Sequence, residues 1–240
     1  MTEAVLFDIG DTLIHFETVS ARALLRTATR PAYDYVAGLG LALPGYEAYA
    51  RSLQRAFMAA YVWSRIKRRE MSLLGVLERA HRRMGLTFDE AHLAELAGQA
   101  TVALRGYMTR DPEATDLVER LAGAGLKLGI VSNTVFPAFG IDDHLRDEGL
   151  LDYFPVRVYS SDVGYMKPHR RIFHVALAQM GVSPERSLFV GDRVDKDVKG
   201  AARVGMKTVL LARNGRVVRG RWRPDHMVKR LGEIGAIVGA

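Results

Sequence analysis

The segment Phe7-Asp8-Ile9-Gly10-Asp11-Thr12-Leu13 closes a short apolar run, residues 4–7, and changes to polar residues within one position. A run that is brief and apolar on both faces predicts a buried strand of a parallel sheet. In open α/β sheets, ligands bind beyond the carboxyl ends of the strands. Asp8 is therefore the first candidate for a functional residue.

Four further runs share this texture, each bounded by Gly, Asp, Asn or Ser. They are 127–131, 156–159, 187–190 and 208–211. Helical patterns alternate with them, near 112–124, 136–148, 169–180 and 195–204. Strands that alternate with helices pair in parallel, so the sequence predicts an α/β fold with a doubly wound parallel sheet.

Residues between the first two runs break this rhythm, because about 95 positions contain no convincing strand. Four helix-like segments take their place, near 18–38, 47–63, 72–84 and 89–107. The sequence thus predicts an all-helical insertion after the first strand. We expect residues 1–17 and 110–240 to form the α/β core domain, and residues 18–109 to form a separate helical domain.

Polar residues follow the later strands as well. Ser132 and Asn133 come after the second run, Lys167 lies in Gly164-Tyr165-Met166-Lys167-Pro168, and Asp192 and Asp197 lie in Gly191-Asp192-Arg193-Val194-Asp195-Lys196-Asp197. Carboxylates beside a lysine at one sheet edge can assemble a site for a hard cation that faces an anionic substrate.

These residues, taken in order, resemble the four signature motifs of the haloacid dehalogenase-like hydrolase superfamily. Phe7–Leu13 is similar to the first motif and Ser132 to the second. Lys167 is similar to the third, and Gly191-Asp192 with Asp197 to the fourth. The helical insertion resembles the cap that this superfamily carries between motifs one and two.

The resemblance implies a magnesium-dependent phosphatase for a small phosphorylated metabolite. Asp8 would attack phosphorus and form an aspartyl-phosphate. Lys167 would neutralise charge, Ser132 and Asn133 would bind the phosphoryl group, and Thr12 would hold the turn after the nucleophile. The Mg²⁺ ligands would be Asp8, the carbonyl of Gly10, Asp192 and Asp197.

Gly10 departs from the pattern of the resembled phosphatases, which carry a second Asp at that position as general acid and base. General acid–base catalysis contributes roughly 10²–10⁴-fold, so alkyl phosphates should react slowly here. The leaving groups of acyl phosphates and phosphoanhydrides are weaker bases, so they depart more easily and need less protonation. Asp11 and His15 lie close in sequence as substitutes, although Asp11 should point elsewhere on the turn.

Three alternatives to a phosphatase stay open at this point. A metal-independent 2-haloacid dehalogenase also lacks the second Asp, but the pair Asp192 and Asp197 is expected of the metal-dependent branch. A binding or regulatory protein would keep the pocket and lose turnover through Gly10. A nucleic-acid-binding protein is suggested only by the charge, and we do not expect one.

The charge is concentrated in the helical insertion. Of 240 residues, 34 are Lys or Arg and 27 are Asp or Glu, which gives a net charge of +7. Residues 18–109 hold 13 of the basic and 7 of the acidic residues, and include Arg65-Ile66-Lys67-Arg68-Arg69. A solvated surface is the simpler interpretation, and steering of anionic metabolites is the sharper one. We expect Phe57, Tyr61 and Trp63 to pack against neighbours, and the five arginines between 213 and 223 to lie in a solvated loop.

Cysteine is absent, which excludes disulfides and thiolate chemistry. The first residues run directly into the first strand pattern, and no apolar run approaches the roughly 20 residues of a membrane span. We therefore expect a cytoplasmic protein with no membrane partner. The sequence does not indicate an oligomeric state.

Overall fold

The computed structural model describes residues 1–17, 21–67, 69–213 and 220–240. The chain forms two compact units. The α/β unit comprises Met1–Phe16, Thr109–Asn133 and Leu145–Ala240, and the helical unit comprises Glu17–Met108 and Thr134–His144.

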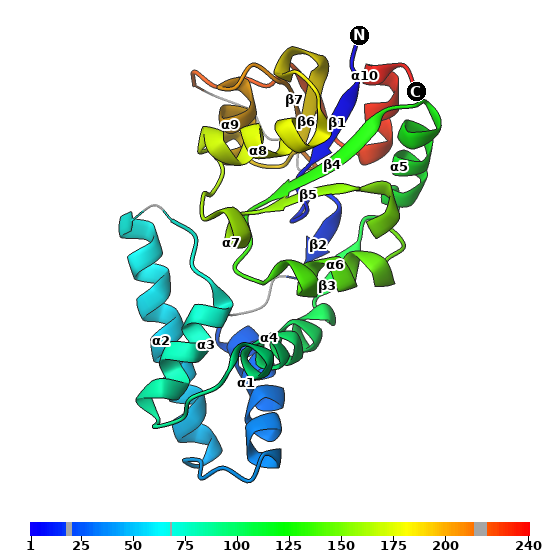
Figure 1. Ribbon diagram of the computed structural model, residues 1–240. Coiled ribbons are helices and arrows are strands. Elements are labelled where there is room, and N and C mark those ends of the chain that lie inside the picture. The colour runs from blue at the N-terminus through cyan, green and yellow to red at the C-terminus, as the bar shows by residue number, and fades with distance from the viewer. Residues whose placement is uncertain (18–20, 68, 214–219) are drawn as a thin grey trace. The chain divides into compact units, whose positions relative to one another are not determined.

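The α/β unit contains a six-stranded sheet in the order β5-β4-β1-β6-β7-β8 (Figure 1). Its strands are β1 (Ala4–Phe7), β4 (Lys127–Ser132), β5 (Val156–Tyr159), β6 (Ser187–Gly191), β7 (Lys207–Leu211) and β8 (His226–Val228). All neighbours pair in parallel. Phe7 pairs in register with Ile130 on one side and Val190 on the other, so β4, β1 and β6 end at the same edge.

Helices cover both faces of this sheet (Figure 1). The α/β unit holds α5 (Ala114–Gly123), α7 (Ser160–Val163), α8 (Arg170–Met180), α9 (Lys199–Ala202) and α10 (Ile234–Val238). Short turns of helix lie at Leu151–Tyr153, Pro184–Arg186, Val194–Val198 and Leu231–Glu233. Buried Phe173 of α8 packs edge-on against Phe189 of β6, with ring centroids 5.2 Å apart. The doubly wound α/β fold predicted from the sequence is confirmed.

The helical unit is built from α1 (Ala21–Gly38), α2 (Tyr46–Lys67), α3 (Leu73–Arg83) and α4 (Glu90–Arg105). Ser72 and Asp89 cap the amino ends of α3 and α4 through their side-chain oxygens. Their apolar faces share one core, which includes Tyr49, Leu77 and Leu96. The segment Thr134–His144 also belongs to this unit, since Leu73 donates its N–H to the carbonyl of Val135 at 3.0 Å.

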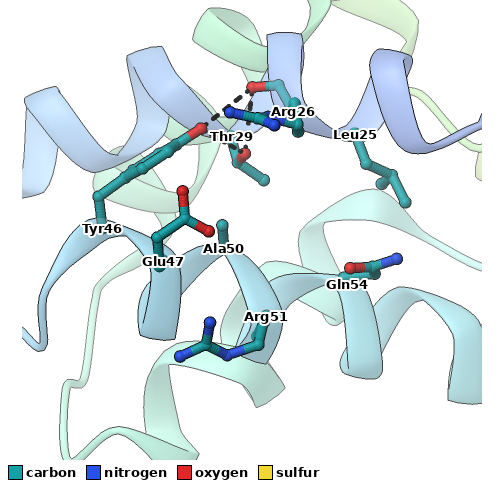
Figure 2. Close-up of a pocket in the computed structure, with 8 residues that line it drawn as sticks. All are labelled: Leu25, Arg26, Thr29, Tyr46, Glu47, Ala50, Arg51 and Gln54. Atoms are coloured by element: carbon teal, nitrogen blue, oxygen red, sulfur yellow. Dashed lines mark hydrogen bonds between the residues drawn. The ribbon is translucent and has the colours of Figure 1, made fainter.

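A pocket of about 300 Å³ lies between α1 and α2 (Figure 2). Hydrogen bonds close one side of it, because the hydroxyls of Thr29 and Tyr46 both reach the carbonyl of Arg26, at 3.2 and 3.4 Å. Glu47 lines the same pocket together with Arg26 and Arg51. The hydroxyl of Tyr46 thus joins α2 to α1 through the carbonyl of Arg26.

The structure corrects the predicted elements in three places. β2 (Ile14–Phe16) and β3 (Met108–Arg110) form a two-stranded sheet, where the sequence predicted no strand between residues 7 and 127. β8 was also not predicted. The helix expected over 195–204 is instead one turn of π-helix followed by the short α9. Residues 18–20, expected to begin the first helix, lie outside the described residues.

The predicted helix near 136–148 is α6 (Ala138–Asp147). Across the described ranges, no helix is both long enough and apolar enough to cross a membrane.

Candidate active site

A buried lysine joins two carboxylates at the edge where β1 and β6 end. The Nζ atom of Lys167 lies 2.8 Å from Oδ1 of Asp8 and 2.8 Å from Oδ1 of Asp197. The Lys167 side chain is 1% exposed. Its charge is therefore matched by carboxylates rather than by water, as a buried cation requires.

A third carboxylate makes the cluster anionic. Oxygens of Asp8, Asp192 and Asp197 all lie within 4.8 Å of one another. Burial, followed by repulsion from Asp197 and Asp8, raises the pKa of Asp192 to about 7. Burial also raises the pKa of Asp197 to about 6, against the opposing effect of Lys167. Three acids around one ammonium leave an excess of negative charge that another cation would relieve.

The chain after β6 is shaped to hold Asp197. The turn of π-helix at Val194–Val198 brings Oδ2 of Asp197 back to the amide of Arg193, which donates to it at 2.9 Å. A Cβ at Gly191 would stand 2.4 Å from that same oxygen. Only glycine leaves room for the carboxylate here, which explains Gly191.

Lys167 is fixed by Asn133 and by an aromatic floor. The amide of Asn133 donates to the carbonyl of Lys167 at 3.1 Å and accepts from its N–H at 2.7 Å. The ring of Phe189 lies below the ammonium, with 5.3 Å between Nζ and the ring centroid. Asn133 was predicted to bind substrate, but here both of its polar groups are used to position the lysine.

The turn after Asp8 is held mainly by its backbone. Asp8 accepts the N–H of Ile9 at 2.8 Å, and Leu13 and Ile14 both donate to the carbonyl of Ile9 at 2.9 Å. Asp11 adopts a left-handed conformation with φ 55°. Thr12 is fully buried, yet its hydroxyl has no hydrogen-bond partner within the described chain. The turn is therefore not secured by the Thr12 side chain in the way we expected.

Arg213, which follows β7, ties this turn to a buried acid. Its guanidinium donates to the carbonyls of Asp11 and Thr12, the latter at 3.1 Å, and to the carboxylate of Asp111. His15 meets the same carboxylate, with 3.0 Å between Nε2 and Oδ2. Sequence analysis missed this network and expected Arg213 in a solvated loop. Of the other four arginines, Arg221 and Arg223 are exposed, as expected, and Arg216 and Arg219 lie outside the described residues.

The two sequence candidates for a substitute acid are engaged elsewhere. Asp11 accepts the N–H of Phe16 at 3.4 Å, and His15 pairs with Asp111. At Gly10, a Cβ would stand 3.3 Å from the ring of Phe16. The space that a side chain at position 10 would enter is thus bordered by an aromatic ring.

Ser132 and Asp195 complete the sequence candidates. Ser132 is buried at the last position of β4, and the strand register brings it to the same sheet edge as Asp8. Asp195 points away into solvent, where it pairs with Arg193 at 3.0 Å. Asp195 is therefore a surface residue, whereas Asp8, Lys167, Asp192 and Asp197 form one cluster.

The donor set fits a hard divalent cation. Three carboxylates provide only oxygen atoms, which Mg²⁺ prefers, and burial together with mutual repulsion raises the pKa of Asp192 and of Asp197. Asp8, Asp192 and Asp197 would hold such an ion. The carbonyl of Gly10 follows in the same turn as the fourth candidate from the sequence.

Comparison with known proteins identifies the family of this chain. Residues 2–205 match the family model described as haloacid dehalogenase-like hydrolase. A glyceraldehyde 3-phosphate phosphatase of Methanopyrus kandleri is 32% identical over 217 residues, which are 89% of this chain and 85% of that protein. A phosphoserine phosphatase of Thermus thermophilus is 34% identical over 53% of this chain and 49% of its own length.

A solved structure extends the similarity to the fold. The crystal structure of a phosphatase of this superfamily from Thermococcus onnurineus is 27% identical to the chain and has a TM-score of 0.63. The similarity covers 100% of this chain and 98% of that one. The chain belongs to the haloacid dehalogenase-like hydrolases and is a hydrolase.

Proposed function

We propose that this hydrolase is a Mg²⁺-dependent phosphatase that acts on a small phosphorylated metabolite through an aspartyl-phosphate. The observation that carries the proposal is the cluster in which Lys167 contacts Asp8 and Asp197, with Asp192 beside them. The relatives from Methanopyrus kandleri and Thermus thermophilus are both named as phosphatases, which supports the reaction class.

Asp8 is the nucleophile in this proposal. One of its oxygens is held by the amide of Ile9 and the ammonium of Lys167. The other attacks phosphorus as the bond to the leaving oxygen breaks, and water then hydrolyses the aspartyl-phosphate at phosphorus. Mg²⁺, when bound, would offset the repulsion between the nucleophile and the phosphate dianion.

The other residues hold charge and orientation. Lys167 stays protonated, because Asp197 and Asp8 raise its pKa against the effect of burial. It can therefore balance charge that builds up on the phosphoryl oxygens. Ser132 supplies a hydroxyl at the same sheet edge. Asn133 acts indirectly, by holding the backbone of Lys167 in place.

Gly10 offers no acid that could protonate the leaving group. We therefore propose that the preferred substrates are acyl phosphates and phosphoanhydrides, whose leaving groups, a carboxylate or a phosphate, are weak bases that depart without protonation. Residues 18–109 would form the cap that selects among them, and the protein would act in the cytoplasm on a small anionic metabolite.

The test is a panel of phosphorylated metabolites, including acyl phosphates, assayed for phosphate release with and without Mg²⁺. A parallel series of aryl phosphates with phenols of graded acidity measures the dependence on the leaving group. We expect Mg²⁺-dependent release and a steep dependence on leaving-group acidity. The variant Asp8→Asn should show no hydrolysis while it still binds phosphate.

Each alternative predicts a different result. Halide release from 2-halo acids that EDTA does not affect would indicate a dehalogenase. Binding of phosphate esters without turnover across the panel would indicate a binding protein. Substantial hydrolysis by Asp8→Asn would remove Asp8 as the nucleophile.

A further inference from the structure

The helical unit carries a basic pocket of about 990 Å³ where α2 ends and α3 begins. Lys67, Arg69, Arg79 and Arg83 line it, against the single acid Glu70. In the part of the chain that the structure describes, none of these four cations forms an ion pair with a carboxylate. Among the described residues that line it, the pocket therefore gathers four cations against one acid.

Two other cations of the helical unit are paired within their own helices. Arg82 on α3 pairs with Glu78 one turn before it, and Arg30 on α1 pairs with Asp34. Arg79 and Arg83, in contrast, are like charges at i and i+4, a spacing that destabilises a helix. An anion bound between them would remove this repulsion.

Trp63 gives the pocket an aromatic wall. Its side chain was expected to pack, but 60% of the residue is exposed. Lys67 follows one turn later on α2 and places Nζ 5.0 Å from the indole centroid. Exposed indole rings beside cations are suited to stacking with the bases of phosphorylated ligands.

The floor of the pocket allows close approach. Ala56, Ala59 and Ala60 line it from α2 with small side chains. On α3, a Cβ at Gly75 would stand 3.2 Å from the guanidinium of Arg79. Arg79 therefore lies over the first turn of α3, on the side of the N-cap Ser72.

We propose that this pocket binds a nucleoside monophosphate. Arg79, Arg83 and Lys67 would hold the phosphate, and Trp63 would stack against the base. The volume is that of a small-molecule site rather than a track for a nucleic-acid strand. The proposal is independent of the proposed hydrolysis, because it concerns binding to the helical unit.

The experiment uses the full chain with the substitution Trp222→Phe. The chain has two tryptophans, so Trp63 becomes the sole tryptophan reporter. Asp8→Asn is added to prevent turnover, and EDTA removes metals. Adenosine 5′-monophosphate is titrated, with adenosine and inorganic phosphate as separate probes. We expect saturable quenching of Trp63 by the monophosphate, and weaker binding of either fragment alone.

Matched variants locate the site. Arg79→Gln and Arg83→Gln should each raise the Kd about tenfold or more, since each removes a hydrogen-bond donor that is charged. Arg82→Gln removes the same charge from the same helix but outside the pocket, and should change the Kd less than twofold. For Trp63→Leu, binding is measured by calorimetry. This variant should bind the monophosphate more weakly and bind inorganic phosphate with unchanged affinity. Its exposed position keeps this variant folded.

Other outcomes would overturn the proposal. Equal losses of affinity for the monophosphate in Arg79→Gln and Arg82→Gln would show that net charge alone attracts it. Undiminished binding by Trp63→Leu and Arg83→Gln would place the ligand elsewhere. A short single-stranded oligonucleotide that binds more tightly than the monophosphate, with a steep salt dependence, would identify a nucleic-acid surface instead.

Discussion

Arg213 shows how one side chain far along the sequence can fix the turn after Asp8. Its guanidinium bonds the carbonyls of Asp11 and Thr12 and the carboxylate of Asp111. Five arginines between residues 213 and 223 look alike in sequence, so nothing there distinguishes the one that turns inward. The partners are also backbone atoms about 200 positions away, which carry no sequence signal.

We expect Arg213→Gln to lower kcat about 10–100-fold with little change in KM. The turn would lose two backbone contacts, and small misplacements of reacting groups cost up to about 10²-fold. Steady-state kinetics on the preferred phosphate ester measures the effect. Arg221→Gln, which removes an arginine that lies over Trp222, is the matched control. Equal kinetics in the two variants would contradict a positioning role.

Gly10 permits a test of the missing acid. Its φ does not lie in the left-handed region, so the backbone accepts a side chain, and the exposed ring of Phe16 must yield only a few tenths of an ångström. We expect Gly10→Asp to raise turnover of alkyl phosphates by about 10²-fold or more, and to flatten the dependence on leaving-group acidity.

Gly10→Asn separates proton transfer from shape, because the amide has the same size and cannot act as an acid. Phe16→Ala in the Gly10→Asp background relieves the neighbouring ring. A folded Gly10→Asp, Phe16→Ala protein that gains no more than Gly10→Asn would show that protonation does not limit the enzyme.

The strands predicted correctly are those that appear in the sequence as apolar runs. β1, β4, β5, β6 and β7 are buried runs of four to six residues, and each was predicted within one residue of its bounds. β2, β3 and β8 have three residues each, too few to show a period. β2 and β3 also pair across the whole helical insertion, which no local pattern reveals.

The candidate site was likewise predicted only in part. The sequence placed Asp8, Lys167, Asp192 and Asp197 together because parallel strands end at one edge. It did not foresee that Asn133 would turn both polar groups to the backbone of Lys167. The type and position of a residue predict that it lies near the site. Whether the side chain of Asn133 then contacts substrate or the backbone of Lys167 depends on the geometry of the loop.

The pairing of α2 with α3 depends on a buried histidine. Nδ1 of His81 donates to the carbonyl of Leu77 at 2.7 Å, so Nε2 accepts from the hydroxyl of Tyr49 at 2.8 Å. Burial lowers the pKa of His81 below its ordinary value near 6.5. The unfolded chain therefore binds a proton at this residue more readily than the folded chain.

We expect this histidine to contribute stability above pH 6.5 that is lost as the pH falls toward its folded pKa. Urea unfolding between pH 5 and 8 should show a smaller gain in stability with rising pH in His81→Gln than in the wild type, because the opposite slope from Asp192 is present in both proteins. Tyr49→Phe should cost about 1–3 kcal/mol, because it leaves a buried acceptor unpaired. A wild-type slope retained in His81→Gln would assign the effect to other groups.

For the whole molecule, the acidic cluster links stability to pH. The pKa of Asp192 is about 7 in the folded chain and near 3.9 in an unfolded one. Without metal, this carboxylate therefore makes the protein less stable as the pH rises from about 4 to 7. Its contribution has the opposite sign to that of His81.

Mg²⁺ should reverse the loss where the carboxylates are ionised. We expect it to raise Tm by roughly 5–10 °C at pH 8, at a concentration of about 100 times its Kd, and to have little effect at pH 5. Thermal unfolding with and without EDTA measures this shift. Asp192→Asn should lose the Mg²⁺ effect and be more stable than the wild type in EDTA, and an unchanged Mg²⁺ effect would place the ion elsewhere.

Net charge acts over the whole molecule, and residues 18–109 account for +6 of the +7. If this charge attracts anionic substrates, kcat/KM should fall about tenfold between 0.05 and 0.5 M salt while kcat stays constant. Arg51→Glu with Arg55→Glu lowers the net charge by four at exposed positions of α2, outside the basic pocket. This double variant should flatten the salt dependence in proportion. A kcat/KM that does not respond to salt would leave the basic residues as a solvated surface, and their concentration on the helical unit would then matter only at the pocket beside Trp63.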